Sequence, residues 1–149
     1  MNHDVKMSMK MGYLYPTTWM ELVPGDKVSI SVENLLRFAP LLAPVMHKVN
    51  VSTHWWAVPI RLLWDGWQEF MRDENDLVAP FINLDGANMT EKDLGNYLGL
   101  PLTSVNNPSI PISPFPFAAY NKIFNENYRD QNLVSELVDQ CVDGDNNSL

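Results

Sequence analysis

The sequence predicts a mainly β protein with short helices in the connections between its strands. Three segments alternate apolar with polar residues, as strands with one dry face do: residues 6–11, 27–32 and 45–57. Eleven prolines stand against seven glycines, which indicates rigid connections and suits β architectures better than helix bundles. Hydrophobic residues make up 46% of the 149 residues and charged residues 19%, so we expect one globular core.

The stretch from residue 45 to residue 71 changes its hydrophobic period halfway and holds four of the five tryptophans. From Val45 to Ala57 the odd positions are mainly apolar, which predicts a strand. After Pro59, which suits a first helical turn, apolar residues recur at spacings of three and four, which predicts a helix. These helical positions are Ile60, Leu63, Trp64, Trp67, Phe70 and Met71.

The N-terminal third contains further strand and turn signals. Lys6 to Met11 places methionines on one face and basic residues on the other, and Gly12 ends it. The pair Pro24-Gly25 predicts a type II turn, because proline presets φ and glycine accepts a positive φ. Lys27 to Val32 is expected to turn its valines and isoleucine inward. Prolines four residues apart in Leu35 to Pro44 predict a buried, irregular connection.

The C-terminal half predicts an acidic exposed loop and two helices. The loop covers residues 72–88 and includes an apolar piece, Leu77 to Leu84. Thr90 with Asp93 resembles a capping box, so a helix of about two turns should follow and end near Gly99.

Residues 101–116 hold five prolines and no charge, so this segment should lie extended against its own domain or another chain. A second helix then presents an aromatic face. Its apolar residues are Phe117, Tyr120, Ile123, Phe124 and Tyr128, with Asn121, Lys122, Asn125 and Glu126 expected off that face.

Composition excludes several classes of function. The formal charge of −8 argues against a domain whose main task is binding phosphate backbones. Cys141 is the single cysteine and cannot form an internal disulfide, and no cysteine and histidine cluster has metal-ligand spacing. We therefore expect no metal and no cofactor. No apolar run has the length of a membrane span or resembles a signal peptide, so the chain should be made in the cytosol.

Three groups of residues suggest a catalytic or metal-binding role, and each has a simpler interpretation. Asp65 and Glu69 stand among tryptophans, as carboxylates do in glycosidases, but the predicted helix places them on its solvent side. His47 and His54 fall on opposite faces of the predicted strand and cannot share a metal. Asp143 to Asn146 lacks the glutamate of a calcium loop and is expected to be a turn. We predict no catalytic residue.

Several long motifs resemble one protein family. They are MGYLYPTTWME from Met11, PGD at 24–26, ENLLRFAPLLAPVMHKVNVSTHWWAVPIRLLW from Glu33 to Trp64, LGNYLGLP at 94–101 and FPFAAYNKIFNENYRDQN at 115–132. In these residues the chain is similar to the N-terminal part of the major capsid protein of microviruses, the small icosahedral phages with single-stranded DNA, and specifically to the gokushovirus branch.

The resemblance implies a viral jelly-roll β-barrel, present here only in part, with long insertions between strands. Residues 1–149 would be the N-terminal part of one such domain, and residues 72–149 its insertion region. Family members are several times longer, so the chain is expected to be a fragment or a truncated gene copy. The implied function is that of a structural subunit that self-associates into an icosahedral shell.

The implied partners are other copies of the same protein, other virion proteins and packaged single-stranded DNA, without a membrane. The implied location is the virion, assembled in the cytoplasm of a bacterial host. Two other classes stay open on the residues alone. A lectin-like β-sandwich would use Trp55, Trp56 and Trp64 as stacking platforms for sugars, and a glycoside hydrolase would use Asp65 and Glu69.

Overall fold

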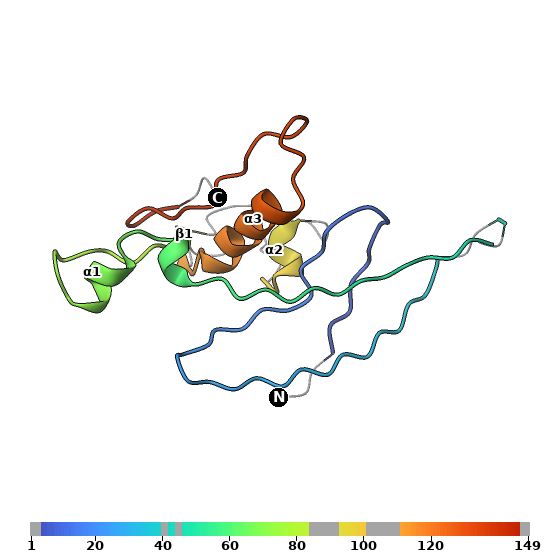
Figure 1. The fold of residues 1–149 in the computed structure, drawn as a ribbon, viewed down its shortest axis with the longest axis horizontal. Coiled ribbons are helices and arrows are strands. Elements are labelled where there is room, and N and C mark those ends of the chain that lie inside the picture. Colours follow the sequence, from blue (N-terminus) through green and yellow to red (C-terminus); the bar gives the residue numbers. More distant parts are fainter. Residues whose placement is uncertain (1–3, 40–41, 44–45, 84–92, 101–110, 147–149) are drawn as a thin grey trace, which may run out of the picture. The chain divides into compact units, whose positions relative to one another are not determined.

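A computed structural model describes residues 4–39, 42–43, 46–83, 93–100 and 111–146 (Figure 1). The chain divides into two compact units, the first made of Met1–Trp19 with Trp56–Leu149 and the second of Met20–Trp55. All helices and strands of the described residues belong to the first unit. In chain order they are η1 (Ile60–Leu62), α1 (Trp67–Met71), β1 (Ile82–Asn83), α2 (Leu94–Tyr97), β2 (Pro111–Ile112) and α3 (Phe115–Asn127).

The second unit contains the turn that the sequence predicts at Pro24-Gly25. Gly25 has a φ of 100°, and the Asp26 N–H donates to the Val23 carbonyl oxygen at 3.1 Å. The Asp26 carboxylate closes the same turn by accepting from the Val23 N–H at 3.0 Å. The prediction of a turn with a positive φ at glycine is confirmed, and Gly12, which ends the methionine segment, also has a positive φ of 87°.

The three predicted strands are absent from the described residues of 6–11, 27–32 and 46–57. A strand exists only where another segment satisfies its backbone N–H and C=O groups, and no described segment pairs with these three in a ladder. Their apolar faces are accordingly uncovered: Val28, Ile30 and Val32 are exposed rather than inward. Of the predicted connection Leu35 to Pro44, the structure describes residues 35–39 and 42–43, which are irregular as predicted. Leu35, Leu36 and Phe38 are exposed instead of buried.

The helix predicted after Pro59 is interrupted. The 3₁₀ turn η1 ends at Leu62, and α1 begins only at Trp67. Between them the backbone of Leu63 and Trp64 pairs with a distant segment, because the Cys141 N–H donates to the Leu63 carbonyl oxygen at 2.7 Å and Trp64 forms a parallel bridge with Cys141. A peptide group committed to such a pairing cannot also extend a helix, so long-range contacts override the local period.

Two short strands form the one sheet of the described residues. In that sheet β1 and β2 run antiparallel, with Ile82 opposite Ile112 and Asn83 opposite Pro111. The helix α2 is shorter than the predicted two turns, and Asp93 is its N-cap residue instead of its third residue. Thr90, the other half of the proposed capping box, lies outside the described residues, as does most of the proline-rich segment 101–116.

The longest helix, α3, agrees with the sequence in position but differs in its buried face. Pro116 occupies its first turn, where no N–H is needed. Its buried residues are Ala118, Asn121 and Asn125, two of which were expected off the packed face. The predicted aromatic residues are only partly buried. Asparagines can replace apolar residues in a packed face when each amide finds a hydrogen-bond partner, and here both do.

Candidate interaction site

The core of the first unit is built around Trp64. Leu63 and Trp64, each 2% exposed, pack with Ala118 of α3 and with Cys141. The Trp64 ring lies 5.4 Å from the ring of Phe70 and 6.4 Å from those of Trp67 and Phe115, measured between centroids. Its indole Nε1 donates to Asp143 Oδ1 at 2.8 Å. Burial of the tryptophan is therefore compatible with its polar nitrogen.

Cys141 lies in the same cluster and is a free thiol, 6% exposed. Burial raises the pKa of this thiol to about 11, because the thiolate would lose its hydration there. A thiol in this state is a weak nucleophile at neutral pH. Cys141 accordingly belongs to the packing of the core.

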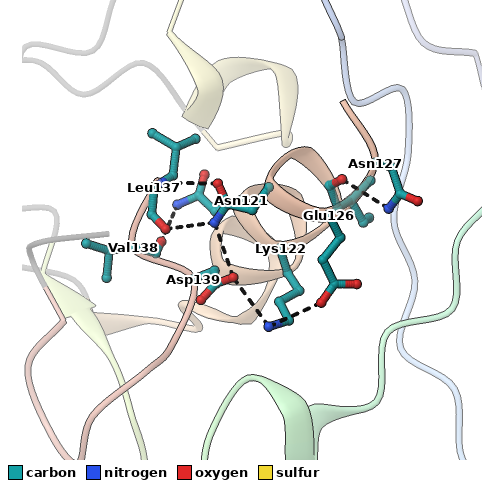
Figure 2. Close-up of polar contacts among 9 residues, drawn as sticks. Asn121, Lys122, Glu126, Asn127, Leu137, Val138 and Asp139 are labelled. Atoms are coloured by element: carbon teal, nitrogen blue, oxygen red, sulfur yellow. Dashed lines mark hydrogen bonds and ion pairs between the residues drawn. The ribbon is translucent and has the colours of Figure 1, made fainter. Parts of the chain in front are cut away.

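Asparagine side chains of α3 hold an extended segment against the helix (Figure 2). The Asn125 amide pairs with Leu137 in both directions: its Nδ2 donates to the Leu137 carbonyl oxygen at 2.8 Å, and its Oδ1 accepts from the Leu137 N–H at 3.0 Å. One turn earlier, Asn121 Nδ2 donates to the carbonyl oxygen of Val138 at 2.7 Å. The two amides take the place that a neighbouring β-strand would take.

An ion pair adds to this attachment. Lys122 Nζ lies 3.5 Å from Asp139 Oδ2 and 3.3 Å from Glu126 Oε1, and Figure 2 shows the lysine between the two carboxylates. Asn125 Nδ2 also donates to Asp139 Oδ2, at 3.2 Å. Burial lowers the pKa of Lys122, but the two carboxylates outweigh it, so that pKa stands above its usual value. The pairing of Lys122 is stable at neutral pH.

The segment after Cys141 turns back on itself and pairs with the backbone at Phe81. Asn146, only 2% exposed, accepts from the Val142 N–H at 2.7 Å and donates to the carbonyl oxygens of Val142 and Gly144, each at 2.8 Å. The Phe81 N–H donates to the Gly144 carbonyl oxygen at 2.8 Å. Asp143 and Gly144 form a bend, which the Asn146 side chain closes through its bonds to Val142 and Gly144.

Aromatic donors fasten the N-terminal residues to α2 and α3. The Tyr97 hydroxyl donates to the Ser8 carbonyl oxygen at 2.9 Å, and the Tyr120 hydroxyl donates to that of Leu14 at 3.0 Å. Trp19 Nε1 donates to the Leu98 carbonyl oxygen at 2.9 Å. Burial, together with nearby Tyr15, raises the pKa of Tyr120, so its hydroxyl stays a donor. These contacts join residues 79 to 106 positions apart.

An apolar depression of about 240 Å³ lies beside these contacts. Its lining comes from Trp19, from the residues that follow α2, and from β2, α3 and Ser113 between them. The lining residues are Trp19, Leu98, Leu100, Ile112, Ser113, Pro116 and Phe117.

The three tryptophans considered as stacking surfaces for sugars differ in their exposure. Trp55 and Trp56 are both about half exposed, whereas Trp64 is 2% exposed. The Trp56 ring meets that of Tyr128 edge to face, with centroids 6.5 Å apart. Trp64 cannot present a face to a sugar ring, because Trp67, Phe70 and Phe115 occupy its surroundings. The three-tryptophan platform is therefore wrong.

Asp65 and Glu69, the two carboxylates considered for hydrolysis, differ in their position and surroundings. Asp65 is exposed and lies before α1 rather than on its solvent face. Glu69 lies within α1, and its Oε2 accepts from Asn75 Nδ2 at 3.0 Å. His47 and His54 are exposed residues of the second unit. No group of three or more histidine, cysteine or acidic side chains able to hold a metal occurs in the part of the chain that the structure describes.

Residues 1–148 match the model of the capsid protein family described as capsid protein (F protein). The chain belongs to this capsid protein family. Capsid protein VP1 of Chlamydia phage 1 is 35% identical over 97% of the chain, and capsid protein VP1 of Bdellovibrio phage phiMH2K is 31% identical over 95%. Capsid protein VP1 of Spiroplasma virus 4 is 26% identical over 91%. The resemblance to the microvirus capsid protein is confirmed.

The chain spans about a quarter of the length of these capsid proteins, 26%, 27% and 25% respectively. Within the described ranges, no helix is both long and apolar enough to span a bilayer.

Sequence reasoning missed the residues that fasten distant segments to α2 and α3. Asn121 and Asn125 looked like solvent-facing positions, since asparagine spaced at four on a helix usually faces water. The sequence does contain an indication of their role. Three asparagines between 121 and 127 are unusual in a helix, because the asparagine side chain competes with the helix backbone for hydrogen bonds. Such a helix needs a partner backbone for its amides.

Proposed function

We propose that this chain is the N-terminal part of the major capsid subunit of a single-stranded DNA phage, a structural protein that associates with copies of itself into an icosahedral shell. The observation that carries the proposal is the match of residues 1–148 to the capsid protein (F protein) family, together with relatives named capsid protein VP1. The jelly-roll barrel, with residues 72–149 as its insertion region, is part of the same proposal.

The distribution of apolar side chains supports association as the task of the chain. Large apolar residues are exposed throughout the second unit, and no described residue of Met20–Trp55 is buried. Large exposed apolar patches mark surfaces that contact other proteins, and these residues could supply one. Exposed residues of this kind include Leu22, Val23, Val28, Ile30, Val32, Leu35, Phe38, Val49, Val51 and Trp55.

A structural role also accounts for the chemistry of the polar residues. Asn121, Asn125 and Asn146 bond to main-chain groups of the same chain, and Lys122 and Asp139 bond to each other. The polar groups of these side chains form hydrogen bonds or ion pairs within the chain, where they stabilise the fold. We propose that the protein is not an enzyme, that it is located in the virion after assembly in the host cytoplasm, and that the finished shell meets other virion proteins and packaged single-stranded DNA.

Electron microscopy of the purified full-length gene product tests the proposal. Closed particles of uniform diameter, without affinity for glycans on an array, are the expected result. Soluble monomers that bind a defined glycan would instead favour the lectin-like module through Trp55 and Trp56, the two tryptophans of that group that are half exposed. A hydrolytic activity lost in Asp65→Asn while particles still form would favour the hydrolase.

A further inference from the structure

The residues from Asp130 to Asn146, named the acidic segment below, combine a fixed backbone with exposed apolar side chains. Asn121 and Asn125 fix the main chain at Leu137 and Val138. The side chains of those two residues are nevertheless 39% and 52% exposed, and Leu133 is 82% exposed. Holding the backbone in place buries little of these apolar side chains. It does reduce the conformational entropy that would be lost when another surface covers them, as in a preorganised contact surface.

The charge of the acidic segment specifies what can cover it. The segment holds five carboxylates and no lysine or arginine: Asp130, Glu136, Asp139, Asp143 and Asp145. Asp139 pairs with Lys122, and Asp143 accepts from the Trp64 indole. Glu136 is exposed and adjoins the fixed Leu137. A complementary partner therefore carries cations interleaved with apolar side chains.

Lys6 to Met11, named the basic segment below, has that pattern. It alternates Lys6, Ser8 and Lys10 with methionines, and Met9 and Met11 are 48% and 74% exposed. Tyr97 fixes it through the Ser8 carbonyl oxygen. Within the described residues, neither lysine of the basic segment nor Glu136 forms an ion pair. Methionine side chains adapt readily to an irregular apolar surface.

We propose that the acidic segment of one subunit docks against the basic segment of a second copy of this chain. This inference rests on the proposed function, because it names one of the contacts through which capsid subunits associate. Glu136 faces Lys6 or Lys10 of the neighbouring copy, and Leu137 and Val138 cover the methionines. The contact is heterologous, since two different surfaces meet, and such contacts build rings and shells when repeated with closure.

Charge exchange in the full-length protein tests the pairing. Glu136→Lys and Lys10→Glu, each alone, should lower the yield of particles roughly tenfold, because like charges then meet across the contact. The double variant should restore the yield to near that of the unaltered protein. Asp65→Lys is the matched control, since it reverses an exposed carboxylate outside both segments, and it should assemble normally.

A cross-link between subunits tests the identity of the partner. Full-length Met9→Cys and full-length Val138→Cys are assembled together, and a disulfide between the two variants should appear under mild oxidation. Each variant carries only one of the two introduced cysteines, so a link between these positions joins different chains. Cys141 is buried, and Val138→Cys assembled with unaltered protein is the control for any reaction of Cys141.

The outcomes separate this inference from the proposed function. Unaltered protein that forms no particles overturns both. Particles that form normally with either single charge variant, a double variant that fails to recover, or co-assembled cysteine variants that form no cross-link overturn the docking of these two segments and leave the capsid function standing. Recovery in the double variant together with the cross-link establishes the contact.

Discussion

At the residue scale, the position of Gly66 follows from the indole beside it. A Cβ atom at this position would lie 2.8 Å from Trp64 Nε1 and 2.9 Å from Trp64 Cε2. The backbone itself, with φ −70° and ψ −5°, would accept alanine, and such a replacement normally stabilises a chain slightly. Trp64 cannot move aside, because it is buried and bonded to Asp143. The steric contact with Trp64 should therefore outweigh the usual gain, so that Gly66→Ala destabilises the fold.

We expect Gly66→Ala to lower the free energy of unfolding of the full-length subunit by about 1–3 kcal/mol, as overpacking does. Urea unfolding followed by tryptophan fluorescence measures it. In a Trp64→Phe background, which removes the atoms nearest to the new methyl group, the same replacement should cost clearly less. An equal cost in both backgrounds would mean that the indole is not the obstacle.

Cys141 gives a prediction about pH at the same scale. Its pKa is raised to about 11 in the folded chain, against about 8.5 for a free thiol. Because the folded state favours the neutral thiol, its contribution to stability is complete below pH 8.5 and is lost as the pH rises from there toward 11. Cys141→Ala should lose less stability than the unaltered protein over this pH range, measured by thermal unfolding. Identical pH profiles would show that the thiol ionises freely.

At the element scale, the success of sequence-based prediction depends on where an element finds its hydrogen bonds. The turn at Pro24-Gly25 and the helix α3 need only local bonds, and both are where the sequence predicts them. Residues 46–57 have the alternation of a strand, but a strand requires a partner that the described residues do not supply. The helix predicted after Pro59 is interrupted for the opposite reason, because a distant segment does supply a partner: the Cys141 N–H donates to the Leu63 carbonyl oxygen.

The attachment of the acidic segment to α3 gives a prediction at this scale. Asn125→Asp keeps the shape of the side chain but removes both donor bonds of Nδ2, to Leu137 and to Asp139. It also places a second carboxylate beside Asp139 in a buried position. We expect a loss of about 2–4 kcal/mol in the free energy of unfolding, since the oxygen that replaces Nδ2 would face the Leu137 carbonyl oxygen and the Asp139 carboxylate without a hydrogen bond.

Asn127→Asp is the matched control for Asn125→Asp, because it makes the same change on the same helix at an exposed residue. Asn127 Nδ2 makes only one bond, to the Ile123 carbonyl oxygen at 3.2 Å, and the change should stay within about 0.5 kcal/mol. Hydrogen exchange at the Leu137 amide adds a local readout. Repulsion between the new carboxylate oxygen and the Leu137 carbonyl oxygen should open this attachment, and so expose the Leu137 N–H, in the first variant only. Equal effects of the two replacements would contradict the role of Asn125.

At the scale of the whole molecule, the family could be predicted from the sequence while the candidate site could not. Long motifs such as the one from Glu33 to Trp64 identify relatives because they preserve the order of many uncommon residues. The attachments at Asn121, Asn125 and Tyr97 join positions that are 12 to 89 residues apart. The local pattern of apolar and polar residues does not indicate which distant positions in the sequence come into contact, so these contacts could be identified only from the structure.

The division into two units gives the last prediction, on the isolated 149-residue chain. Lys27, Arg37 and Lys48 are exposed in the second unit, which has no buried residue among those described. Lys122 lies in α3 and is tied to Asp139. Trypsin cuts where the backbone opens locally, and opening requires little free energy where few apolar contacts and ladder bonds exist. Cleavage after Lys27, Arg37 and Lys48 should therefore precede cleavage after Lys122.

Mass spectrometry of timed digests measures this order. In assembled particles of the full-length protein the same three sites should be cut far more slowly than in dissociated subunits, if the proposed shell contacts cover the exposed apolar residues around Val28 and Val49. Lys122 provides the internal reference, since its attachment to Asp139 lies within one subunit and should protect it in both states. Rapid cleavage after Lys48 in intact particles would show that the second unit stays uncovered in the shell, and that its exposed apolar residues do not serve association.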